Sequence, residues 1–550
     1  MYLVSKMGLP NGNTSNPIIV ENIVTFRRNQ VPLEIYSIPE ISEKRKTTDV
    51  AFLITFALGV VILLSVMIYT LCYSDMQRFT HGYDDCGNVC GSMNSYVEEV
   101  ECSGKDMSDK PFLLYEYNDR RCAESCNGSY SSEFHRCSDN SYYYNEDLNF
   151  LTTTLEDIQT DSVGLTILCL VGLGLSILSL ILFRYFVKPF VWTMLTVSVL
   201  LLWAVTGFMW YLYSINAEWL ISSIGFTIIS FIFSICILVL GLNISIIIFF
   251  FEESIRIVFA MPFILIEPIL TFISNFVVLT LFVCTFFLMS TSGRLQKLEF
   301  NRYDYVADSA MLFALGWSII MMLWTLQFIL ACQQMVIAGA IATYYFARDK
   351  LTVVTPIYSS FYNLIRYHLG TVAFGSLTLT LLTILKLIIR GASRNNGWLR
   401  LIYYCLRPIE NLLKYFTSMG YIETAIHGQP LCRSASRAIN LIISNLLSAV
   451  ALNSVGNFVF FMAKLVIVIL TVGLGLLLKL STVAVVFGGI VALLCVHCFF
   501  VVFEVAVDTI FLCYCEDQCI NNGSSRPYQT TLDLYSQIKK AQALTIASTK

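Results

Sequence analysis

Long apolar runs separated by short polar links dominate the chain. Nine runs each reach the roughly 20 residues with which a helix crosses about 30 Å of hydrocarbon. They cover residues 50–73, 162–183, 189–213, 220–251, 262–290, 309–346, 369–389, 456–478 and 481–513. A tenth run, 438–452, is shorter and carries Asn440 and Asn445, so it predicts either a weak span or a helix lying at the interface. The pattern predicts an all-α polytopic membrane protein with about ten transmembrane helices.

The polar segments between these runs predict the topology. We expect a cytoplasmic N-terminal tail at 1–49, a first transmembrane helix at 50–73, an extracellular loop at 74–161, a transmembrane bundle at 162–513 and a cytoplasmic C-terminal tail at 514–550. The first tail ends in the basic stretch Glu43-Lys44-Arg45-Lys46, and basic residues beside a span favour the cytoplasm. The first apolar run begins too deep for a cleaved signal peptide, so it is expected to act as an uncleaved anchor.

The basic stretch 391–437 conflicts with a simple count of spans. Alternating crossings put it outside, whereas its arginines favour the cytoplasm. One repair divides 309–346 into two crossings near Gln333-Gln334 and lays 438–452 on the membrane; another is a re-entrant pass within 415–436. We expect 391–437 to be cytoplasmic.

Six cysteines fall in the polar loop 74–161: Cys86, Cys90, Cys102, Cys122, Cys126 and Cys137. The same loop contains a glycosylation acceptor, Asn127-Gly128-Ser129. An even number of cysteines beside an acceptor indicates the oxidising side of the membrane and three disulfides. Among these cysteines no histidine lies at ligand spacing except His135, two residues before Cys137, so no metal is expected. The pairing of the six cysteines is not determined by the sequence, and the loop is predicted to be disulfide-rich and extracellular.

Composition excludes several classes of function. Only 13% of residues are charged and 56% are hydrophobic, and the net charge of −3 provides no basic surface for nucleic acid. There is no phosphate-binding glycine loop, no His-Glu-x-x-His motif and no serine elbow. We therefore expect that the protein is not an enzyme and binds no cofactor. We also expect most of the chain to be surrounded by membrane lipid.

Polar groups inside the predicted spans are costly there and are candidates for function. Glu267 precedes Pro268, and a carboxylate beside a helix break is a plausible cation site, although it can equally be a residue at a helix end. Glu504 and Asp508 are four residues apart on one helix face, and His497 lies on the same face seven residues before Glu504. These groups and Lys464, in the preceding span, are candidates for an ion pair between helices or for a proton relay.

Aromatic residues supply a second set of candidates. Trp203, Trp317 and Trp324 lie within spans, and Tyr344-Tyr345 ends the long run 309–346. Aromatic faces attract a quaternary ammonium by cation–π interaction. The alternative is an aromatic belt at the membrane interface. We take Trp203, Glu267, Trp317, Trp324, Tyr344 and Tyr345 as candidate substrate-binding residues.

Several short strings together resemble the choline transporter-like family. They are Arg45-Lys46-Thr47-Thr48-Asp49-Val50, Gly82 through Gly91, Ala338-Gly339-Ala340 with Tyr344-Tyr345, Arg366 through Thr371 with Gly375-Ser376, Ser434-Ala435 with Asn445, and Asp508 through Asp517. They occur in the family's order. Where members carry a Trp-Tyr-Trp run, this chain has Tyr344-Tyr345-Phe346.

This resemblance implies a plasma-membrane or organellar carrier with about ten spans, cytoplasmic tails and a glycosylated first extracellular loop. It also implies transport of choline, or of ethanolamine, for phospholipid synthesis, in a facilitative or proton-coupled manner. Two alternatives remain: a relative that carries another amine or a cofactor, and a non-transporting receptor that acts through the loop 74–161.

Overall fold

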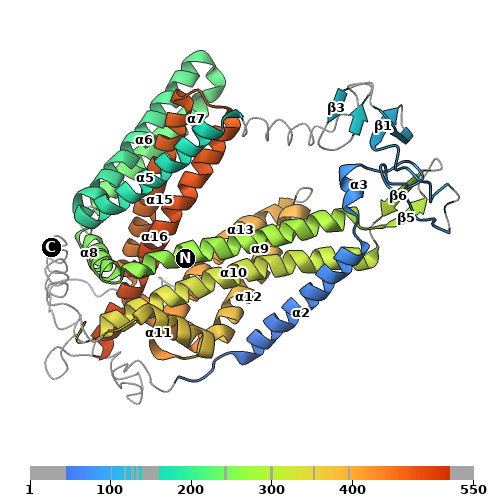
Figure 1. Ribbon diagram of the computed structural model, residues 1–550. Helices are drawn as coiled ribbons and strands as arrows, with labels where there is room; N and C mark the ends of the chain where they lie inside the picture. Colours follow the sequence, from blue (N-terminus) through green and yellow to red (C-terminus); the bar gives the residue numbers. More distant parts are fainter. Residues whose placement is uncertain are drawn as a thin grey trace, which may run out of the picture. The chain divides into compact units, whose positions relative to one another are not determined.

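The structure is a computed structural model made almost entirely of helices (Figure 1). It describes residues 45–98, 100, 102–116, 119–125, 129–131, 136–138, 160–240, 244–297, 302–306, 308–347, 349–350, 353–393 and 397–520. The long helices are α2 (Val50–Tyr73), α5 (Ser162–Tyr185), α6 (Val187–Ile215), α7 (Leu220–Leu240), α8 (Ile244–Ala260), α9 (Glu267–Thr291), α10 (Ser309–Phe346), α12 (Leu369–Ala392), α13 (Gly397–His427), α15 (Leu446–Leu477) and α16 (Thr482–Ile520).

Shorter helices connect the long ones. They are α3 (Met76–Thr80), the 3₁₀ turns η2 (Ala217–Trp219) and η3 (Pro262–Ile266), α11 (Pro356–Asn363), the π-helical turn η6 (Leu364–His368) and α14 (Leu431–Ser444). The π turn joins α11 to α12 without a break, so the helical stretch Pro356–Ala392 is longer than the apolar run 369–389 that predicted it.

Nine helical stretches of the described chain are long and apolar enough to cross a membrane, which confirms the predicted polytopic class. Two runs differ in form from what their pattern predicted. The structure describes the run 220–251 as two elements, α7 and the start of α8, and residues 241–243 between them lie outside the described part of the chain. Helix α8 is amphipathic and carries Glu252, Glu253 and Arg256 in its interior. The run 309–346 does not divide near Gln333-Gln334, since α10 is one helix of 38 residues.

The weak tenth run, 438–452, is not a separate span. Its first residues end the strongly amphipathic helix α14, and its last residues begin α15. The basic stretch 391–437 forms α13 and the start of α14, and its cytoplasmic location stays a prediction.

Two sets of neighbouring helices carry most of the packing (Figure 1). Helix α16 lies against α5 and α15, and α6 lies against α7. Helix α10 packs against α9, α12 and α13, and α2 lies on α10 and α12. Because α16 also packs against α10, α13 and α14, it belongs to both sets. Phenylalanine rings fill the first set, where Phe183 contacts Phe251, Phe460 and Phe503 edge to face.

The segment after α2 is cross-linked by disulfides, as predicted. The pairs are Cys86–Cys102 and Cys90–Cys122. Strands β1 (Phe112–Glu116), β2 (Asp119–Ala123), β3 (Ser129–Ser131) and β4 (Arg136–Ser138) form a sheet in the order β2-β1-β4-β3. Cys126, Asn127 and the side chain of Cys137 lie outside the described part of the chain, as do residues 1–44 and 521–550.

This disulfide-bonded segment docks on the hairpin between α9 and α10. The hairpin consists of the antiparallel strands β5 (Arg294–Lys297) and β6 (Tyr303–Val306). Arg120 pairs with Asp85 at 3.1 Å and with Asp304 at 2.6 Å. The Tyr305 hydroxyl donates to the carbonyl of Gly87 at 2.7 Å. The segment is thereby tied to a hairpin some 200 residues later in the chain, as the separation of 218 between Gly87 and Tyr305 shows.

Candidate functional site

Buried polar side chains gather where α10, α12, α13, α14 and α16 meet. Within a membrane protein such groups are costly unless they are paired, and they mark candidate functional sites. The buried polar residues on these helices and on α11 and η6 include Gln333, Ser360, His368, Thr371, Ser376, Thr380, Thr417, Glu423, Thr424, Ser434, Thr509, Glu516 and Asp517. Five of the six family-like strings fold into this region, although they are scattered from Arg45 to Asp517 along the chain.

Small residues in these strings permit the close approach of the helices. A Cβ at Gly339 would meet the hydroxyl of Ser360, and a Cβ at Gly375 would meet the hydroxyl of Tyr421. Gly339 lies inside the continuous helix α10 and lets α11 pack against it.

Two buried carboxylates, Glu423 on α13 and Glu516 on α16, share the same cationic partners. Arg437 on α14 lies with its Nε 2.8 Å from Glu423 Oε1 and with another guanidinium nitrogen in contact with Glu516 Oε1. His427 Nε2 lies 2.8 Å from Glu516 Oε1 and 3.3 Å from Glu423 Oε1. Glu423 is only 1% exposed and Glu516 is fully buried. The four side chains form one charge cluster that joins three helices.

The charge cluster contains two carboxylates, one guanidinium and one imidazole. Burial raises the pKa of Glu423 well above its usual range, the neighbouring Glu516 raises it further, and Arg437 opposes the rise. Glu423, His427 and Glu516 each have an atom within 4.8 Å of the others, a spacing that could hold a metal ion. The guanidinium of Arg437 already contacts both carboxylates, however, so the arrangement fits an ion-pair cluster better than a set of metal ligands.

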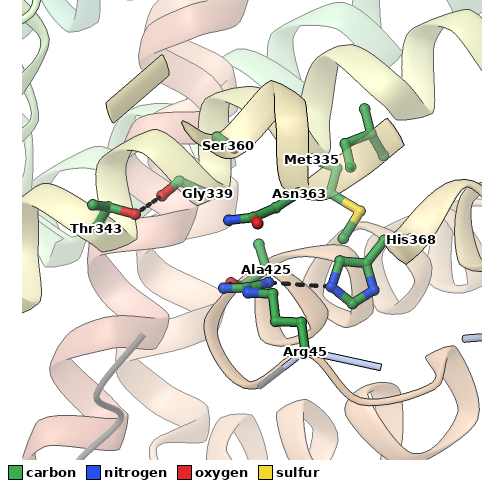
Figure 2. Close-up of a pocket in the computed structure, with 9 residues that line it drawn as sticks. Arg45, Met335, Gly339, Thr343, Ser360, Asn363, His368 and Ala425 are labelled. Atoms are coloured by element: carbon green, nitrogen blue, oxygen red, sulfur yellow. Dashed lines mark hydrogen bonds between the residues drawn. The ribbon is translucent and has the colours of Figure 1, made fainter. Parts of the chain in front are cut away.

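A small pocket lies beside the charge cluster, between α10, α11, η6 and α13 (Figure 2). It is lined by Arg45, Met335, Gly339, Thr343, Ser360, Asn363, Leu364, His368 and Ala425. The pocket has room for about one water. Figure 2 shows the guanidinium of Arg45 beside the His368 ring, where Arg45 donates to His368 Nε2 at 3.2 Å. The pocket is closed to an organic cation in this conformation.

Trp324 is the most deeply buried of the predicted tryptophans. It is 4% exposed, and its indole nitrogen donates to the Ala373 carbonyl at 3.3 Å and to the Ser376 hydroxyl at 3.2 Å. Phe56 of α2 meets its ring edge to face at 5.0 Å and stacks on Phe328 at 4.5 Å. Trp324 thus belongs to an aromatic cluster between α2, α10 and α12, within the spans.

The other predicted aromatic residues lie elsewhere. Trp203 is 41% exposed on α6 and donates to Ser234 of α7, so it faces away from the buried polar region. Trp317 donates to the Gly59 carbonyl at 3.3 Å and packs beside Trp324. Tyr344 and Tyr345 end α10, where the ammonium of Lys350 lies 5.0 Å from the ring centre of Tyr344 and donates to both their carbonyls.

Glu267 is the first residue of α9, directly after the 3₁₀ turn η3. Proline at the second position is suited to a helix start, because its missing N–H would have no partner there. Of the two interpretations, the structure therefore supports the helix-end residue rather than a break inside a span. The positive end of the helix dipole favours a carboxylate at this place.

Helices α15 and α16 bring the predicted charged set partly together. Lys464 forms an ion pair with Glu504, and its ammonium lies 3.2 Å from Nδ1 of His497. Asp508 lies one turn beyond Glu504, in the part of α16 that passes the buried polar region. The first three residues join two helices, and a role in coupling stays a prediction for all four.

Sequence reasoning missed most of the residues that meet in the buried polar region. Arg45, His368, Glu423, His427, Arg437 and Glu516 were not singled out as site residues. Glu423 and His427 stand four apart, a spacing that places them on one helix face, but their stretch was treated as a polar loop. The available signal was the family-like strings, which contain His368 and Glu516.

Comparison with known proteins agrees with these strings. Residues 224–519 match the model of the family described as plasma-membrane choline transporter. The chain is 28% identical to choline transporter-like protein 1 of Torpedo marmorata, over 88% of this chain and 91% of that protein. It is 26% identical to the mouse protein of the same description, over 88% and 90% of the two chains. It is 27% identical to bovine choline transporter-like protein 3, over 91% and 93%.

Proposed function

The chain belongs to the choline transporter-like family, and from this premise we propose that it carries choline, or a choline-like small organic cation such as ethanolamine, across the membrane. As a multi-pass member of a transporter family it is not an enzyme. The observation that carries the proposal is the polar and aromatic region buried between α10, α12, α13 and α16. A protein that only anchors an extracellular segment needs one span and no such interior.

Trp324 is the residue that we propose for recognition of the cation. A quaternary ammonium donates no ordinary hydrogen bond, and tryptophan provides the strongest aromatic face for it. The indole nitrogen is held by Ala373 and Ser376, so the ring orientation is fixed before a ligand arrives. Since the ring is packed in this conformation, α2 or α12 must shift for a cation to reach its face.

Uptake by purified protein in vesicles tests the proposal. We expect saturable uptake of labelled choline, lowered by Trp324→Ala and, to a smaller extent, by Glu267→Gln. Trp203→Ala is the matched control, since that side chain is exposed on α6. Uptake at the level of protein-free vesicles would contradict the proposal. Repeating the assay with and without a pH gradient distinguishes facilitative from proton-coupled transport.

A second candidate is transport of another amine. The observation in its favour is the end of α10, where Lys350 occupies the face of Tyr344. A cation held there by the protein leaves that ring unavailable to a quaternary ammonium of the substrate. A competition panel of choline, ethanolamine and other small amines, each added against labelled choline, separates the two candidates by the order of inhibition.

A further inference from the structure

Residues 45–49, which precede α2 and are here called the N-terminal strap, dock on the helices that line the pocket. The Arg45 guanidinium donates to the Ala425 carbonyl at 2.7 Å, and another of its nitrogens lies 3.2 Å from His368 Nε2. The strap thus reaches α13 and the π turn from the far end of the sequence, as the separation of 380 residues between Arg45 and Ala425 shows.

Thr48 and Asp49 hold the strap in place. The backbone nitrogen of Thr48 donates to the Tyr367 carbonyl at 3.0 Å, and its hydroxyl lies 2.7 Å from that of Thr371. Asp49 Oδ2 accepts from the Thr371 hydroxyl at 2.8 Å and from the backbone nitrogen of Leu431, the first residue of α14, at 3.0 Å. One short segment is therefore bonded to α12 and to the start of α14 together.

The close approach of the strap to α12 depends on one glycine. A Cβ at Gly370 would collide with the carbonyl oxygens of Thr48 and Asp49. Asp49 itself has a left-handed backbone with φ of 54°, a conformation that costs energy for a residue other than glycine and persists because its surroundings impose it. The docked strap is consequently a specific, strained conformation rather than a loose tail.

The docked strap also closes the pocket. Arg45 is the one lining residue that the strap contributes, and it covers the side at which His368 and Ala425 lie. Among the strap residues only Thr48 is buried, while Lys46 and Thr47 are exposed. The strap is held mainly by hydrogen bonds and little by apolar packing, as is typical of segments that open locally.

We propose that the N-terminal strap is a gate, whose docking closes the pocket at the membrane face opposite the disulfide-bonded segment and whose release opens it. The face follows from α2, which separates the strap from Cys86 by one candidate span. The statement that the gate admits the transported cation rests on the proposed function, whereas the opening and closing of the pocket do not.

Thiol labelling of a pocket residue tests the gate without any substrate. Asn363→Cys places a thiol in the pocket wall, and the full-length protein in nanodiscs is labelled with a maleimide and digested for mass spectrometry. Adding Gly370→Ala forces the strap away, so we expect labelling about tenfold faster, because the rate follows the open population. Gly391→Ala, on the same helix with open space at its Cβ, is the matched control and should leave the rate unchanged.

A locked variant provides the opposite perturbation. The hydroxyls of Thr48 and Thr371 lie 2.7 Å apart, so cysteines at both positions can form a disulfide that holds the strap. In the oxidised protein the labelling of Asn363→Cys should fall below that of the unlocked protein and return on mild reduction. The locked variant still tests the gate if Gly370→Ala fails to fold.

The outcomes separate the two proposals. Equal labelling rates in the locked and reduced protein would overturn the gate. Labelling that follows the strap, together with choline uptake that stops on locking and returns on reduction, supports both the gate and the proposed function. Labelling that follows the strap in a protein that never takes up choline supports the gate and contradicts the substrate.

Discussion

Replacing Arg437 tests whether the charge cluster stabilises the packing of α13, α14 and α16. Its side chain contacts Glu423 at 2.8 Å and also contacts Glu516, and both carboxylates are almost fully buried. In Arg437→Gln the two carboxylates keep only His427 as a basic partner. Removing one partner of a buried pair costs about 3–5 kcal/mol. Because the arginine side chain is 22% exposed, we take a lower value of about 2–3 kcal/mol.

The assay is the thermal unfolding of detergent-purified protein, followed by the fraction that remains monodisperse after heating. Arg437→Gln should lower the midpoint, whereas Arg433→Gln, an exposed arginine one turn earlier on α14, should not. Adding Glu423→Gln to Arg437→Gln removes the excess negative charge and should restore about 1–2 kcal/mol. The reasoning is refuted if Arg437→Gln unfolds like the unchanged protein, or if the double variant is no more stable than the single one.

Three further predictions concern other parts of the chain. Trp324→Ala should lower the unfolding free energy by about 3–5 kcal/mol, against less than about 1 kcal/mol for Trp203→Ala, both measured by the same thermal assay. Removing the disulfide Cys90–Cys122, which spans 32 residues, should cost about 3–4 kcal/mol of local stability, seen as faster proteolysis of that segment without faster cleavage elsewhere. Burial raises the pKa of Glu410, but hydrogen bonds and charges of two lysines outweigh it and hold the pKa below its usual value of 4.5. Its contribution is therefore present at neutral pH and lost as the pH falls through that lowered pKa, so Glu410→Gln should flatten the acid limb of a stability–pH curve, and an unchanged limb would contradict this.

The apolar pattern predicted the spans well because each long run has the length of a bilayer crossing. Helix α10 shows where the apolar pattern alone is insufficient. Its polar pair, Gln333-Gln334, suggested a break, but the helix continues through its buried C-terminal half, which packs against α11 and α13. Helix α8 was missed as a separate element, and α14 was predicted only in part, by the interpretation of 438–452 as a helix lying at the interface.

The candidate site was less accessible to sequence reasoning. Of the tryptophans predicted to lie within spans, Trp324 is buried, because it stands in the middle of a long apolar run, whereas Trp203 is 41% exposed. The charge cluster was not found, since Glu423 and Arg437 belong to a stretch whose many charges resemble a loop. A periodicity within one helix cannot show that a carboxylate on α16 meets an arginine on α14, because the two are 79 residues apart in the chain. Such meetings depend on how helices pack, which no local pattern records.

The docking of the N-terminal strap has a consequence for biosynthesis. The first span is made early, but Thr371, which binds Asp49, lies 322 residues later. At a synthesis rate of about 5–20 residues per second, the ribosome needs roughly 15–65 s to reach it. For most of that time α2 stands in the membrane without its final neighbours α10 and α12. We therefore expect α2 to be bound by a chaperone that shields membrane helices until α10 and α12 have been synthesised.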